Sequence, residues 1–274
     1  MKARVITGSD NKKYKEMRAL TQKKYRDKEG RYLVEGDNLV TEALAFGLAE
    51  TVFVRENRPD LMQRYQGRET LGTEFLFLAE PLLNKACATE TNQGVLAVVK
   101  KPAPDIERFM MAANKAAQNK ECNGNLLVLD RLQDPGNLGT ILRTATGAGL
   151  AGGIVLKGTA DIFGPKTIRA AAGAVFRFPL YFADTPAQVA ELCQSMGKRL
   201  IGTTPEGGRP YYEADLAKDV ALVIGNEGNG MSREMLELCA ERVYIPMAAG
   251  LESLNAAVAA GVLLYAGMSQ GKKE

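Results

Sequence analysis

The feature that most constrains this fold is a series of short apolar runs in the second half of the chain. They alternate with stretches of helical periodicity, and they are NLLVLD, GGIVLKG, FPLYF, RLIGTT, VALVIG and RVYIP. Strands that are apolar along their whole length are typical of a parallel sheet with helices on both faces. The sequence therefore predicts an α/β domain with a parallel sheet over residues 125–274.

The first hundred residues predict a second, smaller α/β unit. Strand-like TVFVREN, EFLFLAE and GVLAVV alternate with helical segments such as EGDNLVTEALAFG. The stretch from Lys100 to Phe109 holds two prolines and five charges and is typical of a linker, whereas Met110 to Gly124 predicts a short helix. We therefore expect domains at residues 1–100 and 125–274, joined by a linker over residues 101–124.

Composition narrows the class of protein. The four cysteines lie far apart in sequence, which disfavours a metal site or a disulfide framework and favours the reducing cytoplasm. No apolar run approaches the roughly 20 residues that cross a bilayer, so we expect no membrane partner. The basic first 31 residues leave a transit peptide as an alternative, which their interspersed acids and scarce serine disfavour.

Positive charge is concentrated at the start of the chain. Residues 1–35 carry eleven Lys or Arg against five Asp or Glu, a net charge of +6, so the rest carries −3 of the total of +3. The basic residues are interleaved with Tyr14, Tyr25 and Tyr32, a mixture suited to phosphate contacts and base stacking. RNA or DNA is therefore a candidate partner, and a solvated helix face is the alternative.

The first strand of the C-terminal domain leads into the segment from Leu129 to Leu150. Asp134 begins a turn, Asn137 can cap the helix that follows, and apolar residues recur at helical spacing. At about 100° per residue, Arg143 lies well away from that apolar stripe. Periodicity alone favours a surface arginine here, and a functional role depends on the sheet edge beside it.

Two glycine-rich loops follow apolar strands near the C-terminus. They are LVIGNEGNGMS, from Leu222 to Ser232, and IPMAAGLESLNAAVAAG, from Ile245 to Gly261. Loops that meet at the carboxyl edge of an open α/β sheet commonly form a ligand site, so they suggest a cofactor pocket. The alternative is that Gly225, Gly228 and Gly230 only supply the positive φ angles of a tight turn.

Three segments in fixed order resemble the motifs of the SpoU, or TrmH-like, family of RNA ribose methyltransferases in the SPOUT superfamily. They are DPGNLGTILRTA, LVIGNEGNGMS and IPMAAGLESLNAAVAA. NKKYKEMRAL, KKYRDKEGRYLVEG and NQGVLAVV also resemble the substrate-binding domain that often precedes the catalytic domain in this family. The resemblance covers nearly the whole chain.

The resemblance implies transfer of a methyl group from S-adenosylmethionine to a ribose 2′-hydroxyl of structured RNA, with ribosomal RNA favoured over transfer RNA. It also implies a homodimer and a trefoil knot in the C-terminal domain, a feature that chains generally avoid. No metal is expected. The implied cofactor-binding residues are Thr203, Gly225, Ile245 and Leu254. The implied catalytic residues are Asn137, Arg143, Glu227, Ser253 and Asn255.

The chain has no histidine, which excludes the commonest general base. Arg143 is the family's candidate, but a guanidinium is a poor base, so we expect it to bind a phosphate and help the hydroxyl lose its proton. For Glu227 an orienting role, pairing with Arg143 or capping backbone donors, is favoured over that of a base. Ser253 and Asn255 are alternatively helix caps.

The helix LNAAVAAGVLLY carries an apolar stripe, which by default faces the core and by resemblance contacts a second subunit. The stripe consists of Leu254, Val258, Val262 and Tyr265. Two other classes of protein stay open: a catalytically silent RNA-binding protein of the same fold, and a nucleotide-dependent oxidoreductase. The oxidoreductase is disfavoured because GNEGNG does not have the glycine spacing of a dinucleotide-binding fingerprint.

Overall fold

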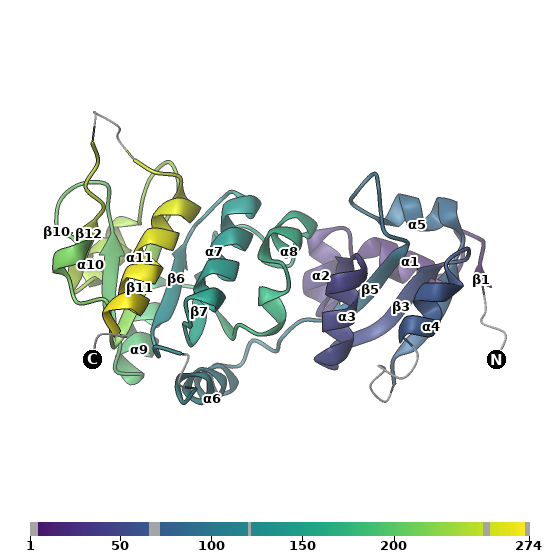
Figure 1. Cartoon of the computed structure of the whole chain (residues 1–274), viewed down its shortest axis with the longest axis horizontal. Helices are drawn as coiled ribbons and strands as arrows, with labels where there is room; N and C mark the ends of the chain where they lie inside the picture. Colours follow the sequence, from purple (N-terminus) through teal and green to yellow (C-terminus); the bar gives the residue numbers. More distant parts are fainter. Residues whose placement is uncertain (1–4, 66–71, 120–121, 249–252, 272–274) are drawn as a thin grey trace. The chain divides into compact units, whose positions relative to one another are not determined.

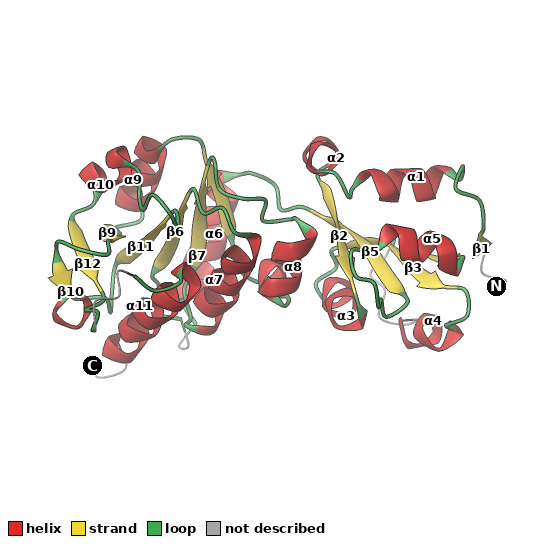
Figure 2. Ribbon diagram, turned by 90° about the horizontal axis from the view of Figure 1, so that it is seen from above, coloured by secondary structure: helices red, strands yellow, loops and turns green. Residues whose placement is uncertain are grey.

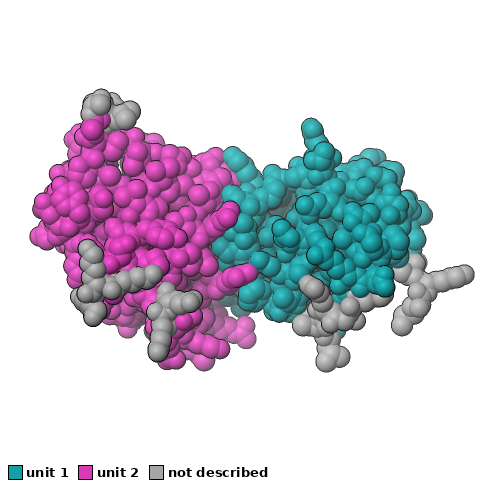
Figure 3. All heavy atoms as spheres, viewed as in Figure 1, with its two compact units in different colours: residues 1–103, 163–176 teal, residues 104–162, 177–274 magenta. Residues whose placement is uncertain are grey.

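The computed structural model describes residues 5–65, 72–119, 122–248 and 253–271. Figure 3 shows the two compact units into which the chain divides. The N-terminal unit comprises residues 1–103 and 163–176, and the C-terminal unit comprises residues 104–162 and 177–274. One short segment from the second half of the sequence therefore belongs to the N-terminal unit.

The N-terminal unit is built on a five-stranded mixed sheet in the order β1-β4-β3-β5-β2. Its strands are β1 (Val5–Ile6), β2 (Arg31–Glu35), β3 (Ala49–Arg55), β4 (Glu74–Leu78) and β5 (Val95–Lys100). Its helices are α1 (Lys12–Ala19), α2 (Lys23–Glu29), α3 (Asp37–Ala45), α4 (Pro59–Tyr65), α5 (Glu80–Ala86) and α8 (Pro165–Ala171). Buried side chains of α1 and α5 pack with β2, β3, β4 and β5 in one apolar cluster, and Figure 2 shows α3 and α4 on the other side of the sheet from α1.

Aromatic contacts explain why residues 163–176 pack with this unit. The rings of Phe163 and Tyr32 lie 4.8 Å apart between centroids, and those of Phe176 and Phe46 lie 6.5 Å apart. The Nζ of Lys101 sits 5.0 Å from the Phe163 ring centroid, close enough for a cation–π contact. The segment thus belongs to the unit by its packing.

Much of the basic, tyrosine-containing segment at the N-terminus has a structural role. Tyr14 and Tyr32 are buried, so the expectation that these two rings could stack on bases is wrong. Arg26 is also buried and donates to the carbonyls of Leu20 and Thr21, at 2.8 Å each. Three further cations of this segment pair with acids, in the pairs Lys13–Glu74, Lys23–Asp27 and Arg31–Glu50. A sequence pattern cannot separate a nucleic-acid surface from a helix that buries its aromatic side.

The C-terminal unit confirms the predicted parallel sheet. Seven strands lie in the order β10-β12-β9-β11-β6-β7-β8, and every pairing among them is parallel. They are β6 (Leu126–Asp130), β7 (Gly152–Leu156), β8 (Leu180–Ala183), β9 (Arg199–Thr203), β10 (Arg209–Pro210), β11 (Val220–Gly225) and β12 (Glu241–Tyr244). β6 and β7 are buried along their whole length, which is why their sequences are continuously apolar.

Helices cover both faces of this sheet (Figure 1). On one face, α6 (Ile106–Ala117), α9 (Pro186–Ser195) and α10 (Arg233–Leu238) contribute to a single apolar cluster with the strands. On the other face, α7 (Pro135–Gly147) packs against α11 (Ala256–Gly271). The helix expected within Met110 to Gly124 begins earlier, at Ile106, and its Phe109 and Ala113 are buried in that cluster.

Two local expectations about helices α7 and α11 are wrong. Asp134, and not Asn137, is the residue that caps α7, and it accepts from the backbone N–H of Asn137 at 2.8 Å. The apolar stripe of α11 does not face the core, since 53% of Val258 and 46% of Tyr265 is exposed. The buried side consists of the small or aliphatic residues Ala257, Ala260, Leu263, Leu264 and Gly267. Small residues let α11 approach the chain beneath it: a Cβ on Gly267 would lie 2.6 Å from the carbonyl oxygen of Leu216.

Among the described residues, no helix combines the length and the apolar character that crossing a bilayer requires.

Candidate active site

The strand order places a ligand site where β6 and β11 lie side by side. From β6 the chain proceeds to β7 and β8 on one side, and it then returns to form β9, β11 and β12 on the other. In open α/β sheets, ligands bind outside the carboxyl ends of the strands at such a reversal of order. The loops that follow β6 and β11 leave the sheet at this edge, and they carry two of the three motifs.

A carboxylate links these two loops. Glu227, in the loop after β11, accepts hydrogen bonds from the backbone N–H of Gln133 at 2.9 Å and of Asp134 at 3.1 Å. It also accepts from the side-chain amide of Asn137 at 3.2 Å. The carboxylate of Glu227 therefore holds the start of α7, and its partners among the described residues do not include Arg143.

These hydrogen bonds also set the ionisation of Glu227. Partial burial raises the pKa of its carboxyl, but the donors from Gln133, Asn137 and Asp134 together outweigh that effect and leave the pKa below its ordinary value. The group is a carboxylate at neutral pH with its lone pairs already engaged. Both facts make it a weak candidate for a general base.

The third motif joins through one further hydrogen bond. Asn255 donates from its side-chain amide to Oδ1 of Asn137 at 2.9 Å. The same side chain caps α11, because its Oδ1 accepts from the backbone N–H of Ala257 at 2.9 Å and of Val258 at 3.3 Å. A continuous chain of side chains, Glu227–Asn137–Asn255, thus connects motifs that are about 90 to 120 residues apart.

Arg143 and Ser253 stand outside this hydrogen-bonded chain. Arg143 lies six residues beyond Asn137 on α7, and its exposed guanidinium makes no hydrogen bond or ion pair with any described residue. Ser253 is exposed just before α11 and likewise has no hydrogen-bond partner in the described parts of the protein. Both side chains are available to a bound molecule.

Asp130, at the end of β6, is a site residue that sequence reasoning missed. Its carboxylate is fully buried and accepts from the backbone N–H of Ser232 at 2.6 Å, the Ser232 hydroxyl at 3.1 Å and Nε of Arg131 at 3.0 Å. Asn226, from the same loop as Ser232, also donates to the carbonyl of Arg131 at 2.9 Å. The loop after β11 is therefore linked to the end of β6 through two of its residues. The available signal was an aspartate ending an otherwise apolar strand.

The predicted cofactor-binding residues lie at the ends of three adjacent strands. Thr203 ends β9, Gly225 ends β11, and Ile245 directly follows β12. The Thr203 hydroxyl is held by donation to the carbonyl of Val223 at 2.8 Å. Leu254, 36% exposed, lies before Asn255 on the way into α11. Residues 249–252 of the same loop lie outside the described residues.

The glycines of the second motif have different roles. Only Gly230 has a positive φ, of 66°, so the alternative that all three supply left-handed backbone is wrong. Gly225 is required for close approach: a Cβ there would lie 2.4 Å from the backbone nitrogen of Met231. An edge made of backbone, a threonine and two aliphatic side chains fits a neutral, planar group such as the adenine of S-adenosylmethionine. The residues at this edge therefore fit S-adenosylmethionine.

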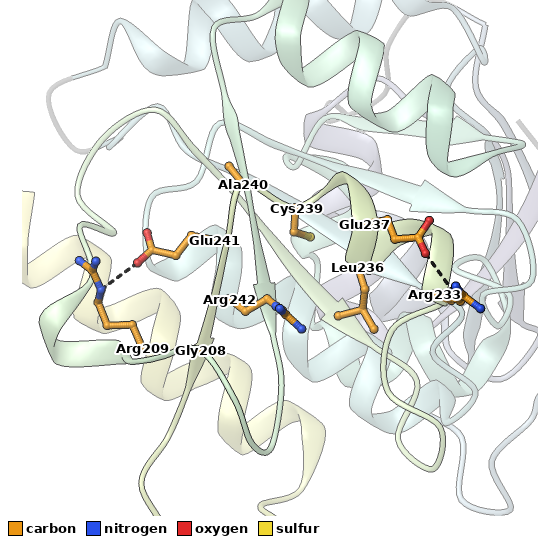
Figure 4. A pocket seen from close by; sticks show the side chains of 9 residues that line it. All are labelled: Gly208, Arg209, Arg233, Leu236, Glu237, Cys239, Ala240, Glu241 and Arg242. Carbon is orange, nitrogen blue, oxygen red and sulfur yellow. Dashed lines mark hydrogen bonds and ion pairs between the residues drawn. The ribbon is translucent and has the colours of Figure 1, made fainter.

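A separate hollow of about 680 Å³ lies beside β12 and α10 (Figure 4). Two of its three lining cations are engaged with acids: Nε of Arg209 lies 3.2 Å from Glu241, and Nε of Arg233 lies 2.9 Å from Glu237. None of the predicted site residues lines this hollow. Among the described residues, no group of three or more His, Cys, Asp or Glu is placed to hold a metal ion.

Comparison with known proteins gives the class. Residues 124–265 match the sequence model of the SpoU rRNA Methylase family, and residues 11–97 match that of the MRM3-like substrate binding domain. The chain belongs to the SpoU rRNA methylase family, and the resemblance inferred from its three motifs is confirmed.

Relatives with assigned names match over nearly the whole chain. RlmP of Bacillus subtilis, a 23S rRNA (guanosine(2553)-2'-O)-methyltransferase, is 36% identical over 261 residues, which cover 95% of this chain and 97% of that protein. The 23S rRNA (uridine(2479)-2'-O)-methyltransferase of Streptomyces viridochromogenes is 31% identical and covers 98% of this chain and 93% of its own.

Solved structures of the same fold contain the cofactor. AviRb from Streptomyces viridochromogenes in complex with AdoMet superposes with a TM-score of 0.83 at 30% identity, covering 95% of this chain and 98% of that chain. The AdoMet-bound rRNA methyltransferase from Sinorhizobium meliloti gives a TM-score of 0.82 at 30% identity and 98% coverage of both. The predicted fold class, a parallel-sheet methyltransferase domain preceded by a small α/β substrate-binding domain, is confirmed.

Proposed function

We propose that this chain transfers the methyl group of S-adenosylmethionine to a ribose 2′-hydroxyl of ribosomal RNA. The observation that carries the proposal is the Glu227–Asn137–Asn255 chain of hydrogen bonds, which holds the three family motifs together at the carboxyl edge of the sheet. Ribosomal RNA is the substrate in the names of relatives that match both units of the chain.

Thr203, Gly225, Ile245 and Leu254 would hold S-adenosylmethionine, largely through backbone groups at the strand ends. When bound, the cofactor supplies a methyl group on a sulfonium, which is already a good leaving group. The protein's part is therefore to hold the ribose oxygen in line with the methyl carbon, at about 3 Å, and to keep that geometry fixed.

Arg143 binds the phosphate next to the target ribose. A guanidinium stays protonated and cannot take the hydroxyl proton itself. It lowers the cost of negative charge on the 2′-oxygen, and the phosphate it holds accepts the proton as the new O–CH₃ bond forms. Ser253 and Asn137 orient the ribose, with Asn137 fixed in turn by Glu227 and Asn255.

The assembly we propose is a homodimer through α11. Its outward side presents Val258 and Tyr265, and Leu254 lies two residues before the helix; all three apolar side chains are at least one-third exposed. A contiguous exposed apolar stripe on a helix is typical of a protein–protein interface. Val258→Glu should convert a dimer into a monomer in sedimentation velocity, and a wild-type protein that sediments as a monomer would contradict the proposal.

We also propose that the C-terminal domain is knotted and that the protein acts in the cytoplasm. In support of the knot, β12 is separated from β6 by β9 and β11 in the sheet, whereas α11, the next helix in sequence, packs on α7, which directly follows β6. In support of the location, all four cysteines are free thiols.

The test is methyl transfer from tritiated S-adenosylmethionine to ribosomal and transfer RNA isolated without the modification. Arg143→Ala should lose about a hundred-fold or more in rate, because substrate positioning is lost. Arg233→Ala is the matched control, since its side chain is 92% exposed in the same unit and serves no proposed role.

Each other outcome has a definite meaning. Label found only in transfer RNA would favour a tRNA ribose methyltransferase. One solved structure whose subject is 2-OH methylation of C/U34 on tRNA covers 55% of this chain, at 28% identity and a TM-score of 0.51. Absence of label together with absence of cofactor binding in calorimetry would favour a silent RNA-binding protein. Equal rates for the two variants would refute the role of Arg143.

A further inference from the structure

A hollow of about 240 Å³ in the N-terminal unit is lined by three segments that are far apart in sequence. The start of α3 contributes Asn38, the loop before β5 contributes Thr89, Thr91 and Gln93, and α8 contributes Arg169. Arg169 comes from residues 163–176, which lie inside the SpoU-matched region but pack with the N-terminal unit. This segment therefore adds a cation to the substrate-binding domain.

Apart from Glu35, Gly36 and Leu39, the lining consists of groups that pair with nucleotides. Within the described residues, the side chains of Asn38, Thr91 and Arg169 make no hydrogen bond or ion pair, and Gln93 uses only its carbonyl oxygen. Amide side chains match the hydrogen-bonding edges of bases, and a guanidinium matches a phosphate in two-point contact. Protein recognition of RNA sequence is directed mainly at unpaired nucleotides whose base edges are free.

The loop that carries these groups is already fixed in place. The carboxylate of Glu35 accepts from the backbone N–H of Ala88 at 2.8 Å and from the hydroxyl of Thr89. Oε1 of Gln93 accepts from the backbone N–H of Asp37 at 2.7 Å. Gly36, with a φ of 97°, lets the turn pass beside Gln93, since a Cβ there would lie 3.1 Å from that oxygen. A preformed site loses less conformational entropy on binding.

Arg169 stands between two hollows of different chemistry. A second hollow of about 320 Å³ shares Glu35 and Arg169 with the first, and its lining includes the aliphatic residues Leu33, Leu96 and Ile168. A cation between a polar and an apolar hollow fits a nucleotide strand, in which a phosphate links two nucleosides that each carry a planar base.

The larger groove of the same unit is less suited to RNA. It has a volume of about 530 Å³ and runs beside α1 and α2 in the basic segment singled out from the sequence. Its lining holds four acids against three cations, so its net charge opposes a polyanion. The acids are Glu16, Glu29, Glu50 and Glu74, and the cations are Lys13, Lys15 and Arg31.

We propose that the hollow of about 240 Å³ binds one unpaired nucleotide of the RNA substrate. The base lies against Asn38 and Gln93, and the phosphate lies on Arg169. The identity of that RNA rests on the proposed function, whereas the binding itself does not. Arg169 thereby makes residues 163–176 part of RNA recognition.

The test compares RNA binding by wild type, Arg169→Gln, Asn38→Ala and the control Arg233→Gln. Unmodified ribosomal RNA transcribed in vitro is titrated in a filter-binding assay at one fixed salt concentration, because RNA affinity depends on salt. We expect Kd to rise roughly ten-fold for Arg169→Gln and less for Asn38→Ala, with the control unchanged. All four proteins should bind S-adenosylmethionine equally, and thiouridine-containing RNA should cross-link within residues 35–39, 88–93 or 165–169.

Several results would overturn the inference. One is wild-type affinity in both variants, even if the wild type methylates RNA normally. A second is cross-linking confined to the groove beside α1 and α2. A third is that Arg169→Gln weakens the binding of uridine monophosphate but leaves RNA affinity unchanged. That result would assign the hollow to a free nucleotide. Conversely, Arg169-dependent RNA binding by a protein that transfers no methyl group would support the inference and contradict the proposed function.

Discussion

Replacing Gly225 by alanine should be the most damaging single-methyl change in the second motif. The added Cβ would lie 2.4 Å from the nitrogen of Met231, 2.6 Å from the carbonyl carbon of Gly230 and 2.9 Å from the Cα of Met231. All three atoms belong to the backbone, so no side chain can turn aside to relieve the contact. Forced overpacking costs about 1–3 kcal/mol, and a clash with backbone alone belongs at the upper end.

The loop must therefore move, and its movement should be felt at the cofactor edge. If the clash raises the free energy of the cofactor-binding loop conformation by about 3 kcal/mol relative to other loop conformations, affinity for S-adenosylmethionine falls by roughly a hundred-fold. Isothermal calorimetry with wild type and Gly225→Ala measures this directly, and thermal unfolding by circular dichroism shows whether the unit itself is destabilised.

Two neighbouring glycines provide matched controls. Gly228 has no positive φ, and the nearest atom to an added Cβ is Oδ1 of Asn226 at 3.7 Å, so Gly228→Ala should change stability by less than about 0.5 kcal/mol. Gly230 has open space but a φ of 66°, so Gly230→Ala should cost about 1–2 kcal/mol through backbone strain. The reasoning is refuted if Gly228→Ala is as harmful as Gly225→Ala, or if Gly225→Ala binds the cofactor normally.

Three further predictions concern the buried and hydrogen-bonded groups. Asp130→Asn places an amide N–H group against the donors of Ser232 and Arg131. Affinity for S-adenosylmethionine should therefore fall about ten-fold or more in calorimetry. An unchanged Kd would contradict the role of Asp130 in fixing the loop. The stabilisation from ionised Glu227 should be complete above its ordinary pKa of 4.5 and should be lost as pH falls through its lower pKa in the folded protein. Glu227→Gln should remove this pH dependence from the thermal unfolding temperature. A variant with the same pH profile as wild type would show that the carboxylate does not contribute to stability. Partial or full burial raises the pKa of three thiols, to about 12 for Cys87 and Cys193 and about 11 for Cys239. Iodoacetamide at pH 8 should therefore label them slowly in the native protein and quickly after unfolding, as peptide mass spectrometry would show, and rapid labelling of the native protein would contradict the raised pKa values.

The architecture of the C-terminal unit could be predicted because its strands are buried on both sides. Continuous apolar runs such as Leu126–Asp130 and Val220–Gly225 are too short for helices of their own, and they occur between helical segments, so a parallel sheet covered by those helices accommodates them best. The same kind of reasoning failed for the basic segment at the N-terminus, because charge and aromatic content do not reveal which side of a helix is buried. Tyr14 and Tyr32 pack into the core, while the cations beside them find acids from other elements.

The contacts of the site could be predicted only in part. The family resemblance implied that Asn137, Glu227 and Asn255 share one site, but their direct hydrogen bonds depend on loop conformations that a sequence pattern does not describe. The same holds for Asp130, because a buried carboxylate is recognised only when its donors are known. Residues 163–176 illustrate the opposite limit, since nothing in their sequence shows that they pack with a unit whose other residues lie before position 104.

The central position of Asn137 explains why an amide is needed there. Its nitrogen donates to the carboxylate of Glu227 while its oxygen accepts from the amide of Asn255, so one side chain must act as donor and acceptor at once. An aspartate could accept from Asn255 but would set a second negative charge against Glu227, and an alanine would leave both neighbours without their partner. The hydrogen-bonded link from Glu227 to Asn255 at the start of α11 therefore passes through a single neutral group. Because Asn137 also lies at the proposed reaction centre, the side chain that holds the motifs together is one that can contact the substrate directly.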